Sequence, residues 1–417
     1  MNENASDQRL NTLVVATTFP RWEKDTEPSF VLDLSEQLAK TASLTVLAPH
    51  APGAKFQDNL RGVPIIRYPY SYPTAQQAVC YDGGILPNLK SRPGAKGQLP
   101  GFLLSQLWHL WRVIRKRRIN FVHCHWVIPQ GIFVALVCRA LKIPYILTAH
   151  GGDAFAFKNS AFVGRLKGFA LSGALHCAVN SQAVRRALEP HSPKTSFPQI
   201  PNGIDSALFN GNKKDPSLKE RFQCKGTLIL GVGRFVEKKG FAYLIDAMPG
   251  ILQSDPDARL LLVGYGPEEA ALKKRVTDNK LNDVVQFPGP RSGEDLAALY
   301  ATADIFIGPS IVADSGDTEG QGIVFLEALA SETAVIASNV GGIADVIRDR
   351  ETGLLVPQKN AEAIASAAAA LIQNPDLVEQ FRSNGRNLIE SRYSWEQAGA
   401  DYLKLYQEAA TSQGLSL

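Results

Sequence analysis

The sequence has no uninterrupted apolar run of about 18 residues, the length that would predict a membrane-spanning helix. Its N-terminal stretch is polar and acidic where a secretory signal would be basic and then apolar: MNENASDQRLN. The chain contains five cysteines, an odd number, and no Cys-x-x-Cys pair, so a complete disulfide framework is not expected. We therefore expect a cytoplasmic protein in a reducing compartment, neither secreted nor membrane-spanning.

The sequence also lacks the residue patterns that would predict a metal site or a dinucleotide site. His123 and His125 flank Cys124 in a strand-like run, and we interpret their alternation as placing the two rings on opposite faces of one strand. Such an arrangement is poor for holding one metal ion, so no metal site is expected. Glycine pairs follow two predicted strands, in GVGRFV (231–236) and GYGPEE (264–269), but both lack the third glycine of the dinucleotide fingerprint. This argues against NAD-type binding.

What the sequence does contain is enough for two ordinary globular domains. Its 417 residues are too many for one core, and 45% apolar with 20% charged residues is typical of a folded globular protein. Charge is unevenly distributed: residues 1–205 carry 23 Lys+Arg against 12 Asp+Glu (+11), and residues 206–417 carry 21 against 28 (−7). A basic half suits nucleic acid, an anionic membrane surface or a phosphorylated acceptor, and charge alone does not choose among them.

Apolar strand-like runs alternate with helical patterns, and the alternation occurs twice along the chain. This pattern predicts an α/β fold with two facing, doubly wound, Rossmann-like domains. The predicted strands lie at 10–18, 43–49, 121–126, 144–150 and 174–180, and then at 227–235, 258–266, 284–289, 303–310 and 334–339. Residues 57–100 are turn-rich and are expected to form an elaborated loop region.

The predicted domains are residues 1–209, residues 210–390 and a C-terminal helical segment, residues 391–417. The first boundary falls where residues 203–225 lose apolar periodicity and gather Asn, Gly, Asp, Lys and Pro. The C-terminal helix is expected over 394–410, with Ser394 as its N-cap. Residues 101–120 are amphipathic with a basic end; we favour a packed domain helix there over a segment that docks on an anionic membrane.

In the second half, polar groups follow two predicted strands, and ligands of doubly wound domains bind beyond the carboxyl ends of strands. Gly233, Arg234 and Lys239 follow the first strand, and a glycine-relieved turn carrying two cations suits a diphosphate. Glu319 and Glu327 follow the fourth strand. If a helix begins near Gly320, the two carboxylates lie on a similar helix face about two turns apart. The free backbone amides would then suit phosphate or sugar hydroxyls: Gly320, Gln321, Gly322 and Ile323.

In the first half, the run PYILTAH ends in TAHGGD. His150 and Asp153 follow a buried strand, and Gly151 and Gly152 permit a tight turn beside a ligand. We interpret His150 and Asp153 as site residues, although a lone histidine at a strand end is more often structural.

Together these motifs resemble retaining glycosyltransferase family 4, whose members have the GT-B fold of two facing Rossmann-like domains and a C-terminal helix crossing back to the first. The motifs that carry the resemblance are the E-x7-E pair Glu319/Glu327, the loop GRFVEKKG, the turn TAHGGD, the hinge IPNGID and the segment SNVGGIADVIRDRETGLLVP. They occur in the family's order, and the resemblance covers essentially the whole chain.

The resemblance implies a hexosyltransferase that uses a nucleotide-diphosphate sugar, without metal or other cofactor. It implies that Arg234 and Lys239 neutralise the diphosphate, that Glu327 binds the ribose, and that Glu319 holds sugar hydroxyls with help from the amides that follow it. His150 would contact the transferred sugar. It also implies a glycan or lipid-linked acceptor, as in envelope or exopolysaccharide assembly, with peripheral contact to the inner face of a membrane through the basic half.

Two positions depart from the family pattern. The loop after the first strand contains no glycine where many members have a Gly-Gly pair: TTFPRWEKDTEPSFV. Gln321 stands where an aromatic residue is common. Three alternatives remain open: another GT-B enzyme such as a sugar-nucleotide epimerase or a phosphorylase, a non-catalytic nucleotide-sugar-binding module, and a nucleic-acid binder. The last lacks any reader motif, so nucleic acid is not an expected partner.

Overall fold

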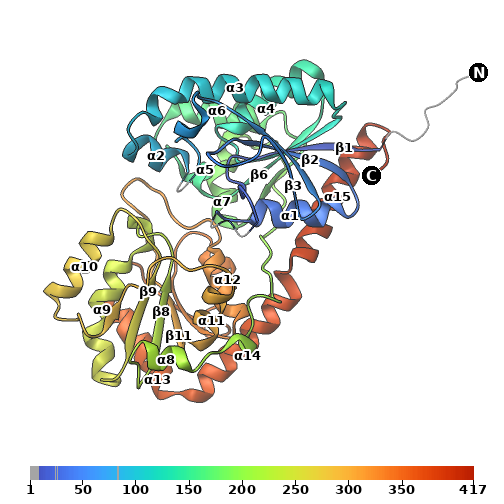
Figure 1. The fold of residues 1–417 in the computed structure, drawn as a ribbon. Coiled ribbons are helices and arrows are strands. Elements are labelled where there is room, and N and C mark those ends of the chain that lie inside the picture. Colours follow the sequence, from blue (N-terminus) through green and yellow to red (C-terminus); the bar gives the residue numbers. More distant parts are fainter. Residues whose placement is uncertain (1–8, 24, 26, 82–83) are drawn as a thin grey trace, which may run out of the picture. The chain divides into compact units, whose positions relative to one another are not determined.

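The computed structural model describes residues 9–23, 25, 27–81 and 84–417. The chain forms two compact units (Figure 1). The first comprises the chain up to Asn180 together with Val184–Gly203 and Trp395–Leu417, and the second comprises Ser181–Ala183 and Ile204–Ser394.

The first unit is built on a seven-stranded sheet with the order β3-β4-β2-β1-β5-β6-β7. Its strands are β1 (Asn11–Val15), β2 (Ser43–Pro49), β3 (Gln57–Leu60), β4 (Val63–Tyr68), β5 (Phe121–His125), β6 (Tyr145–Ala149) and β7 (Cys177–Val179). All pairs are parallel except the edge pair β3–β4. Without β3, the parallel strands have the Rossmann order 3-2-1-4-5-6, which reverses direction between β1 and β5.

Helices cover both faces of this sheet, as right-handed crossovers between parallel strands require. They are α1 (Phe30–Ala39), α2 (Ile85–Ser91), α3 (Ala95–Lys116), α4 (Gln130–Leu141), α5 (Gly152–Phe155), α6 (Ala161–Leu171), α7 (Gln182–Leu188) and α15 (Trp395–Ser412), with 3-10 turns at Thr74–Gln76 and Glu189–His191. One face carries α1 and α15, and the other carries α3, α4 and α6 (Figure 1).

The expectation of a loop region over residues 57–100 is wrong. This stretch contains β3, β4, α2 and the first turns of α3. Strand β3 has polar residues at its first three positions, and β4 contains Pro64 and Arg67. The alternation of apolar and polar residues that marks a strand is therefore hidden. Arg67 is nevertheless almost fully buried.

The second unit has a six-stranded, fully parallel sheet with the order β10-β9-β8-β11-β12-β13, again the Rossmann order. Its strands are β8 (Leu228–Val232), β9 (Arg259–Val263), β10 (Val285–Gln286), β11 (Ile305–Gly308), β12 (Ala334–Ser338) and β13 (Leu354–Val356). Of the six strands of this sheet, the sequence did not predict β13, which is three residues long. The predicted doubly wound α/β class is confirmed.

Two apolar layers sandwich this sheet. The helices are α8 (Ser217–Arg221), α9 (Phe241–Ser254), α10 (Glu269–Asp278), α11 (Gly293–Thr302), α12 (Ile323–Ala330), α13 (Ala361–Gln373) and α14 (Pro375–Arg392), with 3-10 turns at Gly211–Lys213, Glu237–Lys239 and Ile343–Asp345. The sheet order reverses between β8 and β11, so the loops after these two strands flank the switch point where ligands of such sheets bind.

The helix expected near the C-terminus is present. It is α15, and although it directly follows α14 of the second unit along the chain, it belongs to the first unit. It packs against α1 and joins the core with Trp395, Tyr402 and Tyr406.

Candidate functional site

The loop after β8 brings Gly233, Arg234 and Lys239 to the switch point of the second unit. Gly233 has φ 150°, and a Cβ atom there would lie 3.1 Å from Cε of Lys239. Glycine therefore leaves room for the lysine side chain to lie along the backbone of the turn. The sequence predicted that these three residues lie close together. The positive φ of Gly233 and its contact with Lys239 explain why a glycine occupies that position.

Lys239 pairs with Glu319 from the loop after β11. Its Nζ lies 3.1 Å from Oε1 of Glu319, and the two side chains are only 14% and 9% exposed. Burial by itself would raise the pKa of Glu319, but Lys239, Lys238 and Arg234 outweigh that effect and hold the pKa below its ordinary value. Glu319 is therefore an ionised, buried acceptor among three cations.

Lys238, which the sequence prediction did not single out, fastens the acidic loop. Its ammonium donates to Oδ1 of Asp317 and to the carbonyl oxygen of Thr318, both at 3.2 Å. The sequence shows two adjacent lysines, Lys238 and Lys239, and the prediction assigned a role to Lys239 only. The structure gives one lysine to the carboxylate of Glu319 and the other to the backbone just before it.

Helix α12 begins later than the sequence predicted. Its first residue is Ile323, and Gly322 precedes it with φ 80°, a left-handed conformation that favours glycine. Gly320 and Gln321 lie in the turn before the helix. The expectation that Glu319 and Glu327 share one helix face is therefore wrong, because Glu319 is not helical. Both carboxylates instead lie close enough to Lys239 for its positive charge to favour their ionised forms.

Glu327 is held by Tyr300, a partner that no local sequence signal marked. The Tyr300 hydroxyl, from α11, donates to Oε2 of Glu327 at 2.7 Å. Burial raises the pKa of Glu327, and the Tyr300 hydrogen bond and Lys239 offset that only in part. The Tyr300 hydroxyl thus orients the Glu327 carboxylate.

Two glycines after β12 fit directly against the Glu319 loop. A Cβ atom on Gly341 would lie 2.2 Å from the carbonyl oxygen of Glu319, and one on Gly342 would lie 1.8 Å from that of Gly320. The Gly342 amide donates to the carbonyl oxygen of Glu319 at 3.0 Å. The glycine pair of the SNVGG motif is therefore required for backbone-to-backbone contact that fixes the loop carrying Glu319.

His150 and Asp153 lie in the first unit, after β6. The Asp153 carboxylate accepts hydrogen bonds from the amides of Val127 (2.7 Å), His150 (3.1 Å) and Gly151 (3.2 Å). It therefore joins the loop after β5 to the loop after β6. Both of its oxygens are engaged with backbone, so the geometry favours a role in orienting His150.

The interpretation that His123 and His125 point to opposite faces is wrong. Residues two apart in a strand share a face, and these rings stack with centroids 4.5 Å apart. Nδ1 of His125 lies 2.9 Å from Nε2 of His150. Burial lowers the pKa of His150 to about 3, and burial also lowers that of His125, so both rings are neutral near pH 7.

These neutral rings form a chain of contacts. His123 hydrogen bonds to the Tyr406 hydroxyl at 2.9 Å and to the Thr148 hydroxyl at 2.8 Å. Nδ1 of His150 is buried and makes no hydrogen bond within the described part of the chain. No group of three or more His, Cys, Asp or Glu side chains suited to a metal ion occurs among the described residues.

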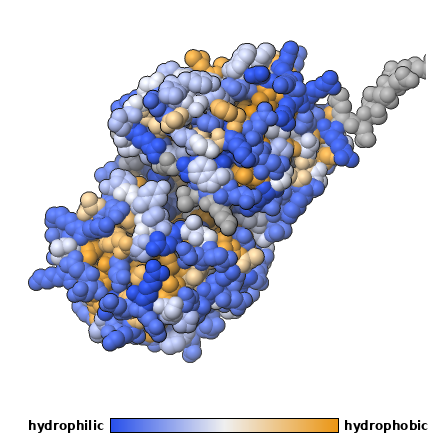
Figure 2. Space-filling model, in the orientation of Figure 1, coloured by the Kyte–Doolittle hydropathy of each residue, from blue (hydrophilic) through white to orange (hydrophobic). Residues whose placement is uncertain are grey.

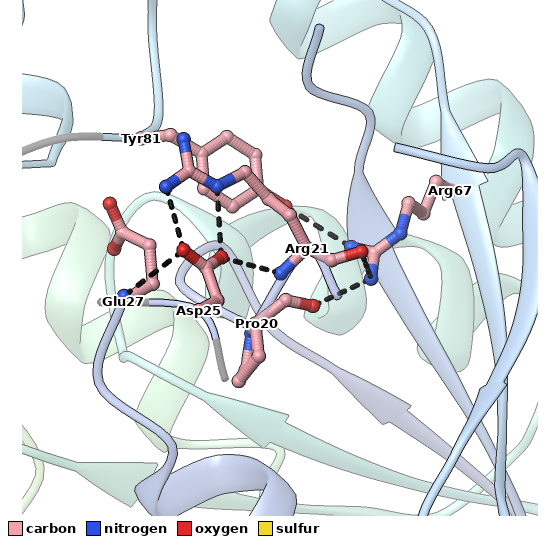
Figure 3. Close-up of polar contacts among 6 residues, drawn as sticks. All are labelled: Pro20, Arg21, Asp25, Glu27, Arg67 and Tyr81. Atoms are coloured by element: carbon pink, nitrogen blue, oxygen red, sulfur yellow. Dashed lines mark hydrogen bonds and ion pairs between the residues drawn. The ribbon is translucent and has the colours of Figure 1, made fainter. Parts of the chain in front are cut away.

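In the glycine-free loop after β1, Arg21 and Asp25 make charged contacts among the described residues (Figure 3). Asp25 accepts two hydrogen bonds from the Arg21 guanidinium, at 2.8 and 2.7 Å, and one from the Arg21 amide. Arg67 of β4 donates to the carbonyl oxygen of Pro20 at 2.6 Å, and the Tyr81 hydroxyl lies 3.4 Å from its other terminal nitrogen. Arg67 and Tyr81 thus support the turn at Pro20, which contains no glycine.

The predicted site residues fall into two groups. The second unit brings together nine of them at its switch point: Gly233, Arg234, Lys239, Glu319, Gly320, Gln321, Gly322, Ile323 and Glu327. The first unit holds His150 and Asp153. Within the described residues, no helix is both apolar and long enough to cross a membrane.

Two Rossmann-type units, one with paired cations and carboxylates at its switch point, define a glycosyltransferase of the GT-B fold. Among solved structures, the chain is similar to HepE from Anabaena in complex with UDP, with a TM-score of 0.72 and 18% identity over 96% of this chain and 100% of that one. The family model "Glycosyltransferase Family 4" matches residues 29–208, and "Glycosyl transferases group 1" matches residues 214–388. The chain belongs to glycosyltransferase family 4.

Two curated relatives act on phosphatidylinositol lipids by name. The phosphatidyl-myo-inositol mannosyltransferase of Mycobacterium leprae is 27% identical over 92% of this chain and 93% of its own length. The GDP-mannose-dependent alpha-(1-6)-phosphatidylinositol monomannoside mannosyltransferase of Mycobacterium tuberculosis is 32% identical over 54% of this chain and 60% of its own.

Proposed function

We propose that this glycosyltransferase moves a hexose from a nucleoside diphosphate to a lipid-linked or polysaccharide-precursor acceptor, with retention of anomeric configuration. The observation that carries the proposal is the shielded Lys239–Glu319 pair, set beside Arg234 and Lys238 at the β8/β11 switch point. Such a site offers cations for a diphosphate and an ionised carboxylate for hydroxyl groups within one small volume.

The two cations supply the charge that a metal ion supplies elsewhere. A nucleoside diphosphate gains negative charge as it leaves the sugar, and Arg234 and Lys239 would stabilise that charge without a divalent ion. Glu319, ionised at neutral pH, can accept hydrogen bonds from sugar hydroxyls. The backbone amides of Gly320, Gln321, Gly322 and Ile323 would add donors at the start of α12.

Glu327 suits the ribose of the donor. Tyr300 engages one of its oxygens and fixes the orientation of the carboxylate. A carboxylate whose charged form is disfavoured by burial is stabilised by a further hydrogen-bond donor, and the two ribose hydroxyls are such donors.

His150 would contact the transferred sugar as a neutral imidazole. Because its Nε2 is engaged with His125, its Nδ1 remains for a sugar hydroxyl. Asp153 holds the backbone of His150 in place. No side-chain nucleophile is assigned, so retention would follow from attack on the face that the diphosphate leaves, with the departing phosphate taking the acceptor proton.

The donor and acceptor are proposed from the relatives. The names of two of them specify mannosyl transfer to phosphatidylinositol lipids, and one specifies GDP-mannose. GDP-mannose is therefore the first donor to test, with UDP-sugars beside it, and a lipid-linked acceptor on the cytoplasmic side of a membrane is the first acceptor class.

A metal-free thermal-shift screen tests the proposal. The wild type, Arg234→Gln and Glu327→Ala are heated with GDP, UDP, ADP and their sugar conjugates, and Arg350→Gln serves as an exposed arginine control in the same unit. A ligand that binds only the folded state raises the unfolding midpoint. We expect one diphosphate to stabilise the wild type and the control but neither site variant. No shift with any nucleotide, or equal shifts in all four proteins, would refute the site.

Transfer itself needs a product assay. The stabilising donor is incubated with a polyprenyl-phosphate or phosphatidylinositol lipid, and the anomeric configuration of the product is read by NMR coupling constants. Binding without transfer to any acceptor would favour a nucleotide-sugar-binding module, and an inverted product would exclude the front-face mechanism.

A further inference from the structure

A chain of three histidines leads from the core of the first unit to His150. His123 and His125 stack within β5, and Nδ1 of His125 lies 2.9 Å from Nε2 of His150. His123 and His125 are 0% and 1% exposed, whereas His150 is partly exposed. Hydrophilic residues cover most of the face of the molecule in Figure 2, so a polar chain beneath the surface calls for an explanation.

One hydrogen atom lies between His125 and His150. Burial lowers the pKa of His150 to about 3 and also lowers that of His125, so each ring is neutral near pH 7 and carries a single N–H. One of the two facing nitrogens therefore donates and the other accepts. Either His125 donates through Nδ1, or His150 donates through Nε2.

The other nitrogen of His125 decides between these two arrangements. Nε2 of His125 is buried and has no hydrogen-bond partner in the described part of the chain, and the same is true of Nδ1 of His150. Each arrangement thus leaves one N–H without a partner in the ligand-free chain. At Nε2 of the fully buried His125 that N–H would stay unpaired, which is costly. At Nδ1 of the partly exposed His150, a bound ligand can supply the acceptor.

The neighbours of His125 hold it in place for this contact. Both nitrogens of His123 are engaged, Nδ1 with the Tyr406 hydroxyl at 2.9 Å and Nε2 with the Thr148 hydroxyl at 2.8 Å. The ring on which His125 stacks is therefore fixed at two points. Asp153 holds the backbone amide of His150 at 3.1 Å, so its backbone and its ring are positioned by different residues.

We propose that His125 is a positioning residue that donates its Nδ1–H to Nε2 of His150 and so keeps the proton of His150 on Nδ1. His150 is then a hydrogen-bond donor toward an oxygen atom of the transferred sugar, and not an acceptor for a hydroxyl proton. The assignment to the sugar rests on the function proposed above. The tautomer does not, so the two can fail separately.

Nitrogen-15 NMR of the ligand-free, full-length protein, labelled at histidine, tests the tautomer. Two histidines of the same unit are internal references, because a carbonyl oxygen can only accept. Nδ1 of His109 lies 2.9 Å from the carbonyl oxygen of Ser105, and Nε2 of His50 lies 2.9 Å from that of Ala54. At pH 7.5 we expect His125 and His150, assigned with the variants His125→Asn and His150→Gln, to give the Nδ1–H pattern of His109. A His150 signal of the His50 type would overturn the proposal.

Two replacements of His125 separate its hydrogen bond from its packing. His125→Asn keeps an amide N–H near the position of Nδ1, whereas His125→Phe keeps a ring against His123 but has no donor. We expect His150 to keep its tautomer in His125→Asn and to populate the Nε2–H form in His125→Phe. With the donor and acceptor of the proposed reaction, His125→Phe should transfer sugar about tenfold more slowly and His125→Asn within about threefold of the wild type. The nucleotide-induced thermal shift should be the same in all three proteins.

His191→Phe, at a partly exposed histidine in the Glu189–His191 turn, is the matched control and should transfer sugar like the wild type. Unfolding midpoints are measured, and rates are compared well below them. Transfer by His125→Phe at the wild-type rate, or equal losses in His125→Phe and His125→Asn, would overturn the positioning role. If the wild type neither binds a nucleotide nor transfers a sugar, the proposed function fails, and the NMR pattern still decides the tautomer. The same pattern decides it if His125→Phe does not fold.

Discussion

Lys239 and Glu319 are each other's charge partner, and both are largely shielded from water. A cation in such a place is stable only while its partner remains, because the energy of bringing either ion out of water is offset by the other. The pair therefore has two properties that can be separated by mutation. It holds two loops of the second unit together, and in the function proposed above it presents both an ammonium and a carboxylate to the donor.

We predict that Lys239→Met destabilises the protein by about 2–3 kcal/mol, because it leaves the buried Glu319 carboxylate without its nearest cation. The double variant Lys239→Met/Glu319→Gln should recover about 1–2 kcal/mol of that loss, since both charges are then absent. Urea unfolding of the wild type, the two single variants and the double variant gives the coupling. Additive losses would show that the two side chains do not interact in solution.

Glu327 leads to the opposite prediction for stability. Its pKa is raised by burial, so the folded chain keeps a proton in a pH range where the unfolded chain has lost it, and stability falls as pH rises through that range above 4.5. Glu327→Gln removes this penalty and can still accept the Tyr300 hydroxyl proton. We predict an unfolding midpoint at pH 7.5 equal to or about 2 °C above that of the wild type, together with complete loss of the nucleotide-induced shift.

The pH dependence provides the check on this assignment. As the pH rises above 4.5, the midpoint difference between Glu327→Gln and the wild type should grow, because the unfolded wild type loses its Glu327 proton while the folded chain still keeps it. A variant that is less stable than the wild type at every pH would mean that the Glu327 charge stabilises the unit and that its pKa is not raised.

At the scale of elements, the loops after β8, β11 and β12 act as one assembly because their backbones touch. Gly341 is the position where this is most easily tested. It has φ 56°, and a Cβ atom there would meet the carbonyl oxygen of Glu319 at 2.2 Å, whereas Gly293 has φ 55° with no atom within 4 Å. The two glycines thus share their backbone strain and differ in what a side chain would meet.

We predict that Gly341→Ala abolishes nucleotide-induced stabilisation while Gly293→Ala keeps it, because only the former displaces the loop that carries Glu319. Both variants should lose a similar amount of stability, about 1 kcal/mol, from the unfavourable φ, and Gly341→Ala should lose more from the clash. Thermal shifts with the stabilising nucleotide measure both effects. Equal nucleotide responses in the two variants would contradict the role given to the glycine pair.

The elements also show what a single sequence can and cannot predict. Fully apolar strands such as β11 can be predicted from the sequence because continuous apolar runs are local signals. The contacts that shape the site are not local: Tyr300 reaches Glu327 from another helix, and Arg67 supports Pro20 from another strand. The start of α12 was misplaced because an acidic, glycine-rich turn and a capped helix start have similar compositions.

At the scale of the whole molecule, residues far apart in sequence share one core. Helix α15 lies at the end of the chain, yet Tyr406 packs edge-on against Phe121 and its hydroxyl hydrogen bonds to His123, both in β5. Tyr402 hydrogen bonds in the same way to Thr148 of β6. The first unit therefore cannot complete its core until the second unit and α15 have been synthesised.

We predict that Tyr406→Ala destabilises the first unit by about 3–5 kcal/mol through loss of a fully buried ring, and that Tyr406→Phe costs about 1–2 kcal/mol by leaving Nδ1 of His123 without its partner. Because these contacts lie entirely within the first unit, hydrogen exchange should speed up in β1, β5 and β6 and stay unchanged in β8, β11 and β12. Nucleotide-induced protection around Glu319 should also persist in Tyr406→Phe. Equal loss of protection in both sheets would mean that the two units unfold as one cooperative body, and α15 would then stabilise the whole molecule rather than the unit it packs in.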